Sequence, residues 1–221
     1  MLANIVFETF DKGGPVMWPI LVTFTVCLAV VCERVFWWTR ERARRDHKKL
    51  DSVFDALQGG DYMTASHVAK DSKDPLLRTV YHGLHHANSS LVGAMQMAAG
   101  IELQRAGRFL GVLDTIVTLA PLLGLLGTVT GIMHSFKFVG NEELAAVKVS
   151  GGIAEALIAT ACGLGIAIFA LIPFNYYTRK MANLQFELET TMNNVDILVE
   201  SAKQRGYDTQ VFRRDSQSTK A

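Results

Sequence analysis

Three long apolar windows constrain this chain more than any other feature of its sequence. They cover residues 17–38, 111–136 and 151–177, and each could cross a bilayer, which takes about 20 residues of helix. A backbone inside a bilayer must satisfy its own hydrogen bonds, so each such window is expected to be an α-helix. Charged residues make up only 19% of the chain and hydrophobic residues 49%, a balance too apolar for an ordinary soluble domain of this size. The sequence therefore predicts an all-α membrane protein with three transmembrane helices.

The lysines and arginines are distributed unevenly around these windows. Eleven of the 22 lie in residues 39–110 and seven in residues 179–221, whereas only three precede the first window or separate the second from the third. By the positive-inside rule, residues 39–110 and the C-terminus face the cytoplasm. The N-terminus and the loop at 137–150 then lie on the opposite side, outside the cytoplasm, which makes the chain a multi-pass protein.

The segments between and after the windows also follow helical patterns. From about residue 91 the pattern runs unbroken into the second window, which predicts one helix over about 91–136, bent at Pro121. The third window continues to about residue 205 through apolar residues spaced three and four apart, and Gly206 would end that helix. Two of the three membrane helices are therefore expected to extend into a cytoplasmic helical body.

These observations predict an order of segments along the chain. The segments are an amphipathic N-terminal segment on the periplasmic side (1–16), the first span (17–38), a cytoplasmic helical region (39–110), the second span (111–136), a periplasmic loop (137–150), the third span (151–177), a cytoplasmic helical extension (178–206) and a disordered tail (207–221).

Small residues recur at helical spacing in the second and third windows. Such faces let helix backbones approach closely, and ordinary helix packing explains them without any solute. They predict contacts between the two helices or with neighbouring copies of the chain, and a closed ring of identical subunits would satisfy every such interface. The small-residue positions are Gly124, Gly127 and Gly131 in the second helix and Ala154, Ala161 and Gly165 in the third, widened by Gly151, Ala159, Gly163 and Ala167.

Four polar residues inside the windows are the candidate functional residues. They are Asp114 and Thr128 in the second helix and Glu155 and Thr160 in the third. An ionisable side chain within a span is costly and usually faces protein or water. Plainer explanations exist for each: an ion pair with an arginine for Asp114, a capping or snorkelling acid for Glu155, and threonine hydroxyls bonded to the i−4 carbonyl. The sequence leaves both kinds of explanation open.

The sequence carries no motif of catalysis or metal binding. It has no phosphate-binding loop, no G-x-S-x-G and no H-E-x-x-H, and its three cysteines all lie within the windows without metal or disulfide spacing. His82, His85 and His86 fall on one side of a helix, but no third-ligand pattern accompanies them. We therefore expect no enzyme activity, no cofactor, no metal and no nucleic-acid partner.

Several motifs make the chain similar to the MotA/TolQ/ExbB proton-channel family. They are LAPLLGLLGTVTGIMHSF at 119–136, GGIAEALIATACGLGIAIFALIPFNYY at 151–177, and KGGPVMWPI and ER at the two ends of the first helix. The resemblance covers about residues 5–205. Three spans and an outside N-terminus resemble the ExbB/TolQ branch rather than the flagellar MotA branch, and the opening KGGPVMWP is most like ExbB.

The resemblance implies a pentameric ring in the inner membrane of Gram-negative bacteria. A single-span partner of the ExbD or TolR type would occupy the pore, where its aspartate carries the proton. Thr128, Glu155 and Thr160 would then lie on the proton pathway, with Asp114 as the candidate at its inner end.

The sequence leaves several hypotheses of function open. The complex would use the proton motive force to drive a TonB-like transducer of outer-membrane transport, or a TolA-like transducer of the Tol-Pal envelope-constriction system. A non-conducting membrane scaffold and a stand-alone ion channel are the alternatives of other classes.

Overall fold

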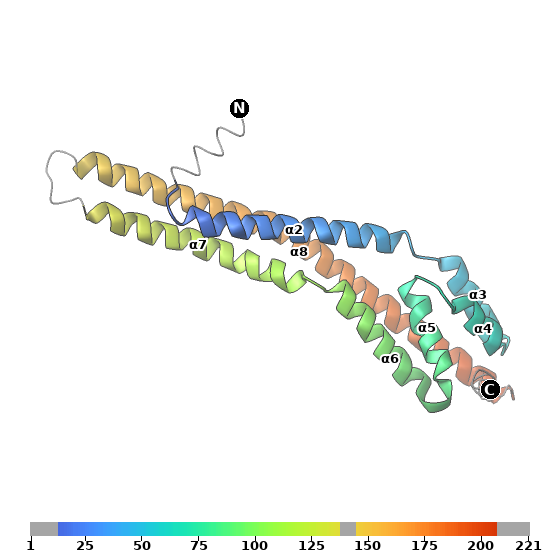
Figure 1. The fold of residues 1–221 in the computed structure, drawn as a ribbon. Helices are drawn as coiled ribbons and strands as arrows, with labels where there is room; N and C mark the ends of the chain where they lie inside the picture. The colour runs from blue at the N-terminus through green and yellow to red at the C-terminus, as the bar shows by residue number, and fades with distance from the viewer. Residues whose placement is uncertain (1–12, 138–144, 207–221) are drawn as a thin grey trace, which may run out of the picture. The chain divides into compact units, whose positions relative to one another are not determined.

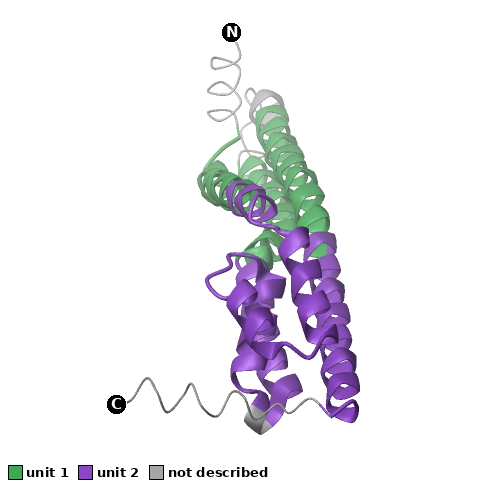
Figure 2. Ribbon diagram, turned by 90° about the vertical axis from the view of Figure 1, so that its right-hand side faces the viewer, with its two compact units in different colours: residues 1–35, 109–178 green, residues 36–108, 179–221 purple. Residues whose placement is uncertain are grey.

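The computed structural model describes residues 13–137 and 145–206, and within them it is built of α-helices without a β-strand (Figure 1). Contacts divide the chain into two compact units, coloured separately in Figure 2. We call residues 13–35, 109–137 and 145–178 the membrane unit, and residues 36–108 and 179–206 the helical body. The helices are α2 (Met17–Arg42), α3 (His47–Gln58), α4 (Tyr62–Ala69), α5 (Pro75–His85), α6 (Ala87–Ala106), α7 (Leu110–Phe136) and α8 (Ala145–Gln204).

Three helices of the described chain are long and apolar enough to cross a membrane, namely α2, α7 and α8. This confirms the prediction of three apolar membrane helices. Only 28% of the most apolar stretch of each is buried within the chain, so most of that surface is left for lipid or for other subunits. The oligomeric ring stays a prediction. The predictions for residues 1–12, 138–144 and 207–221 lie outside the described residues.

The single helix expected over about 91–136 is instead two helices, which corrects that prediction. α6 ends at Ala106 and α7 begins at Leu110. The backbone N–H of Gly107 donates to the carbonyl of Leu103 at 2.8 Å and closes the last turn of α6. Phe109 then takes a left-handed conformation with φ of 64°, which costs a non-glycine residue about 1–3 kcal/mol.

Arg34 of α2 lies over the Phe109 ring, 5.7 Å from its centre. The Arg34 side chain is fully buried in the membrane unit and donates hydrogen bonds to the carboxylate of Glu33. Glu33 and Arg34 therefore form an ion pair within α2. A desolvated cation over an aromatic face is attracted to it, so Arg34 favours the turn conformation that separates the two helices.

The regular part of α6 begins where the sequence pattern predicts. Ser90 has an extended backbone with φ of −164° and ψ of 102°. Its Oγ accepts a hydrogen bond from the backbone N–H of Gly93 at 3.1 Å, which is the geometry of an N-cap. The uninterrupted helix therefore starts at Leu91.

The helical body encloses a hydrophobic core that α3, α4, α5 and α6 share with the last third of α8. The apolar seam predicted on α8 is part of it. Residues at intervals of three or four face the core because they fall on one side of the helix. The buried seam residues are Leu184, Leu188, Thr191, Val195 and Ala202.

The turns of the helical body lie at glycine, aspartate and proline residues. Gly60 has a positive φ of 75° in the turn between α3 and α4. Asp74 accepts a hydrogen bond from the backbone N–H of Leu76 and so caps α5, which begins with Pro75. After α8 ends, Gly206 has φ of 90°, as expected for a residue that ends a helix.

Candidate functional site

Within the membrane unit, α7 and α8 approach each other closely along a face of small residues (Figure 1). A Cβ atom on Gly124 would lie 2.9 Å from the Cα atom of Thr160, and one on Gly127 would lie 2.5 Å from the Cβ atom of Ala159. Both distances are below ordinary van der Waals contact, so these two positions have no space for a side chain. Glycine at these positions lets the two backbones meet.

The same close approach continues toward both ends of this face. A Cβ atom on Gly131 would lie 3.0 Å from the Cβ atom of Ala156. On α8, a Cβ atom on Gly163 would lie 2.5 Å from the carbonyl oxygen of Ala120. The contacts run in opposite directions along the two helices, so α7 and α8 are antiparallel. The face extends over about three helical turns.

Of the small residues predicted to pack on α8, Ala159 and Gly163 meet α7, whereas three others do not lie on that face. Ala154, Ala161 and Gly165 are exposed on the single chain, and a Cβ atom on Gly165 would meet no atom within 4 Å. They take no part in the contact with α7, and their contact with other copies stays a prediction. The residues that do pack recur at intervals of three and four along one side of α8. They include Gly152, Ala156, Ala159, Thr160 and Gly163.

Thr160 is the polar residue that joins the two helices. Its Oγ1 donates a hydrogen bond to the carbonyl oxygen of Gly124 at 2.8 Å, and the side chain is half-buried. Thr128 is also half-buried, but its Oγ1 donates to the carbonyl of Leu125 in its own helix at 2.7 Å. A threonine oxygen that donates its proton in this way can still accept hydrogen bonds. Thr128 therefore bonds to a carbonyl of its own helix, as the plainer explanation expects, whereas Thr160 bonds to a carbonyl of another helix.

The two acidic candidates lie toward opposite ends of the face between α7 and α8. Glu155 is half-buried and packs against the backbone of Gly14, whose φ is 69°. A side chain at Gly14 would collide with the Glu155 carboxylate. Asp114 is exposed on α7, six residues before Ala120, whose carbonyl oxygen lies against Gly163 of α8. Within one chain, the structure therefore does not gather the four polar candidates into one cluster.

Comparison with known proteins agrees with the family resemblance of the sequence motifs. Residues 69–190 match the model of the MotA/TolQ/ExbB proton channel family. A putative biopolymer transport protein, ExbB-like 1 of Synechocystis sp., is 35% identical over 175 residues, which cover 76% of this chain and 68% of that protein. The biopolymer transport protein ExbB of Salmonella typhimurium is 31% identical over 163 residues, covering 69% of this chain and 66% of that protein.

A relative named TolQ rather than ExbB matches a shorter part of the chain. The Tol-Pal system protein TolQ of Haemophilus influenzae is 42% identical over 83 residues, covering 37% of this chain and 36% of that protein. The region matched by the family model contains α7 and the contacts of Gly124 with Thr160. The chain belongs to the MotA/TolQ/ExbB proton channel family.

Proposed function

We propose that this chain is the channel subunit of a proton-driven complex in the inner membrane. Five copies would form a ring around a single-span partner of the ExbD type. The observation that carries the proposal is the hydrogen bond from Thr160 to Gly124, because it places a half-buried hydroxyl where two membrane helices of a proton-channel family meet.

The proposed mechanism uses threonine hydroxyls as steps in an apolar pore. Hydroxyls of Thr128 and Thr160 can accept from a protonated carboxyl of the partner as they stand, and each can donate to an ionised one after releasing its backbone carbonyl. They add no fixed charge, so the pore favours proton transfer over leakage of other ions. Glu155 and Asp114 would receive and release the proton at the two ends. A proton that crosses the membrane supplies about 2.3 kcal/mol per 100 mV, which the complex would convert into movement of the partner.

The process that the complex drives is the second part of the proposal. We favour transport across an outer membrane through a TonB-like transducer, since the ExbB-named relatives match most of this chain. A TolQ-like role in envelope constriction with a TolA-like transducer is the alternative, supported by the 42% identity within the shorter match. Neighbouring genes distinguish the two: a receptor and a TonB-like gene, or a TolA-like and TolB-like set.

The test of conduction compares two variants of one residue. The chain and its ExbD-like partner are placed in liposomes, and proton uptake is followed with a pH-sensitive dye. Thr160→Val keeps the shape of the side chain but removes the hydroxyl, and we expect at least about a tenfold loss of flux, the equivalent of one hydrogen bond. Thr160→Ser keeps the hydroxyl and should retain most of the flux.

Two other results would overturn this proposal. Equal flux for the wild-type chain and Thr160→Val would support a non-conducting scaffold. Full flux without the partner would instead identify a stand-alone channel.

A further inference from the structure

Glu41 is a buried carboxylate in the helical body, outside the α7–α8 site. Its side chain is 3% exposed near the end of α2, and it follows the predicted first span at 17–38. One carboxylate oxygen, Oε2, lies 3.5 Å from Nη1 of Arg44, which is an ion pair but a poor hydrogen bond. The other oxygen, Oε1, is buried without a hydrogen-bond partner among the described residues. An ionised carboxylate in this position would be expensive.

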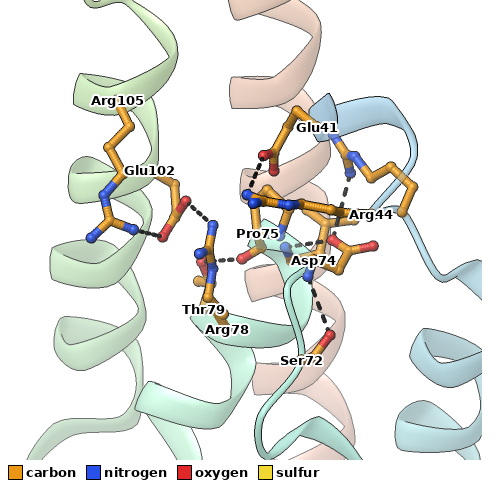
Figure 3. A network of polar contacts seen from close by, with 11 residues as sticks. Glu41, Arg44, Ser72, Asp74, Pro75, Arg78, Thr79, Glu102 and Arg105 are labelled. Atoms are coloured by element: carbon orange, nitrogen blue, oxygen red, sulfur yellow. Dashed lines mark hydrogen bonds and ion pairs between the residues drawn. The ribbon is translucent and has the colours of Figure 1, made fainter. Parts of the chain in front are cut away.

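Arg78 of α5 is one of the charged groups that affect Glu41, and it pairs with a second carboxylate, that of Glu102 (Figure 3). Its Nη2 donates to Oε2 of Glu102 at 2.6 Å, and Nη1 of Arg105 donates to the other Glu102 oxygen at 3.0 Å. Glu102 of α6 is thus paired at both oxygens. In contrast, Nε of Arg78 is buried and has no hydrogen-bond partner among the described residues. Arg78 therefore has a spare donor, and Glu41 has a spare acceptor.

Arg45 also lies within ion-pair distance of two other carboxylates. Its Nη1 is 2.7 Å from the carboxylate of Glu187 on α8 and 3.9 Å from that of Asp74, but makes no hydrogen bond among the described residues. Asp74 also accepts hydrogen bonds from the backbone N–H groups of Asp46 and Leu76. The charged groups that act directly on Glu41 are Arg44, Arg45, Arg78 and Glu102.

We propose that Glu41 is a proton-binding site of the helical body. The proton comes from the surrounding water and binds to a carboxylate oxygen of Glu41, which becomes neutral. Neutral Glu41 does not attract Arg78, so the arginine pairs with Glu102 alone, as in the structure. Loss of the proton creates a charge that draws the spare Nε of Arg78, which then bridges the carboxylates of α2 and α6. Glu41 lies near the end of α2, the same helix that forms the predicted first span. Binding of the proton therefore changes the charge at the end of a membrane helix.

The test measures protonation of the full-length chain in detergent, without any partner. Infrared difference spectra are recorded as the pH rises from below the ordinary pKa of a glutamate, about 4.3. We expect a band of a protonated carboxyl group that persists above this pH in the wild-type chain, disappears as the pH rises further and is missing from Glu41→Gln. The band should persist in Glu189→Gln, a matched control at an exposed glutamate of α8. A band that is unchanged in Glu41→Gln would overturn the proposal.

A second variant keeps Glu41 itself and tests its neighbour. Removing the nearby cation with Arg78→Gln should shift the disappearance of the band to higher pH, whereas Arg78→Lys should shift it less. Fluorescence of Trp37 and Trp38, which lie one turn before Glu41, should change with the same midpoint. An unshifted midpoint in Arg78→Gln would overturn the proposal even if Glu41→Gln failed to fold. Since no partner is present, either failure leaves the conduction proposal standing.

Discussion

Two glycines of α8, two residues apart, have opposite surroundings. A Cβ atom on Gly163 would lie 2.5 Å from the carbonyl oxygen of Ala120 and 3.0 Å from the Cα atom of Gly124. One on Gly165 would meet nothing within 4 Å. These atoms near Gly163 belong to the backbone, so they cannot turn aside as a flexible side chain would. The membrane unit therefore depends on the absence of a side chain at one of these positions only.

This difference predicts opposite effects for the same substitution. Gly163→Ala should destabilise the chain by about 1–3 kcal/mol, because the two helices must separate to admit the methyl group. Gly165→Ala should be neutral or stabilise by up to about 1 kcal/mol, the difference in helix propensity. Thermal unfolding of the purified chain in detergent, followed by circular dichroism, measures both. Equal stability of the two variants would contradict the close packing of α7 against α8.

At the scale of single elements, α4 illustrates how a short helix depends on its cap. The helix has 8 residues, too few to be stable on its own. Asp61 accepts a hydrogen bond from the Thr64 side chain at 2.6 Å and another from the Thr64 backbone N–H at 2.9 Å. These two bonds lower the pKa of Asp61 below its ordinary value. The cap is therefore strongest when the carboxyl group is ionised.

The sign of the resulting pH dependence follows from that shift. Because the pKa of Asp61 is lower in the folded chain, its stabilisation is complete above the unfolded value of about 3.9 and is lost as pH falls through the folded value. At neutral pH, Asp61→Ala should destabilise the helical body by about 1 kcal/mol. Asp61→Asn keeps a capping oxygen and should be close to wild type at neutral pH, but without this acid dependence. Denaturant unfolding at several pH values would test this, and acid profiles alike for wild type and Asp61→Asn would contradict it.

At the scale of the whole molecule, the helical body is assembled from segments far apart in the sequence. Its core combines four consecutive helices, α3 to α6, with the last third of α8. The intervening residues belong to the membrane unit. Contacts between such distant segments are slow to form, because a long loop must close first. The α8 extension therefore has to be in place before this core is complete.

This arrangement predicts a large effect of a single buried residue on the whole body. Leu188 is fully buried in the shared core, whereas Ile197 of the same helix is 65% exposed. Leu188→Ala should destabilise the body by about 2–5 kcal/mol through loss of burial and creation of a cavity. Ile197→Ala should change unfolding by less than about 0.5 kcal/mol. Denaturant unfolding with limited proteolysis of α3 to α6 provides the measurement, and protection of these helices in Leu188→Ala would contradict a shared core.

Local pattern determined the helical class, the three membrane helices, the apolar seam of α8 and the motifs that identify the family. Each of these properties depends on residues within a few turns of one another, so periodicity and hydrophobicity are enough to recognise them. Turn residues such as Gly60 and Asp74 were likewise recognisable, since their backbone preferences are intrinsic.

The break at Phe109, the partner of Thr160 and the burial of Glu41 were decided only by the tertiary structure. The first depends on a cation from α2, and the second on how α8 is rotated about its own axis against α7. The sequence named Ala154, Ala159, Gly163 and Gly165 alike as small residues, and that rotation placed only Ala159 and Gly163 of these four in the contact. Glu41 lies in the basic stretch TRERARR, and a stretch with so many charges is expected to face water. Charge and spacing describe a residue's own helix, whereas burial depends on the helices that other parts of the chain bring against it.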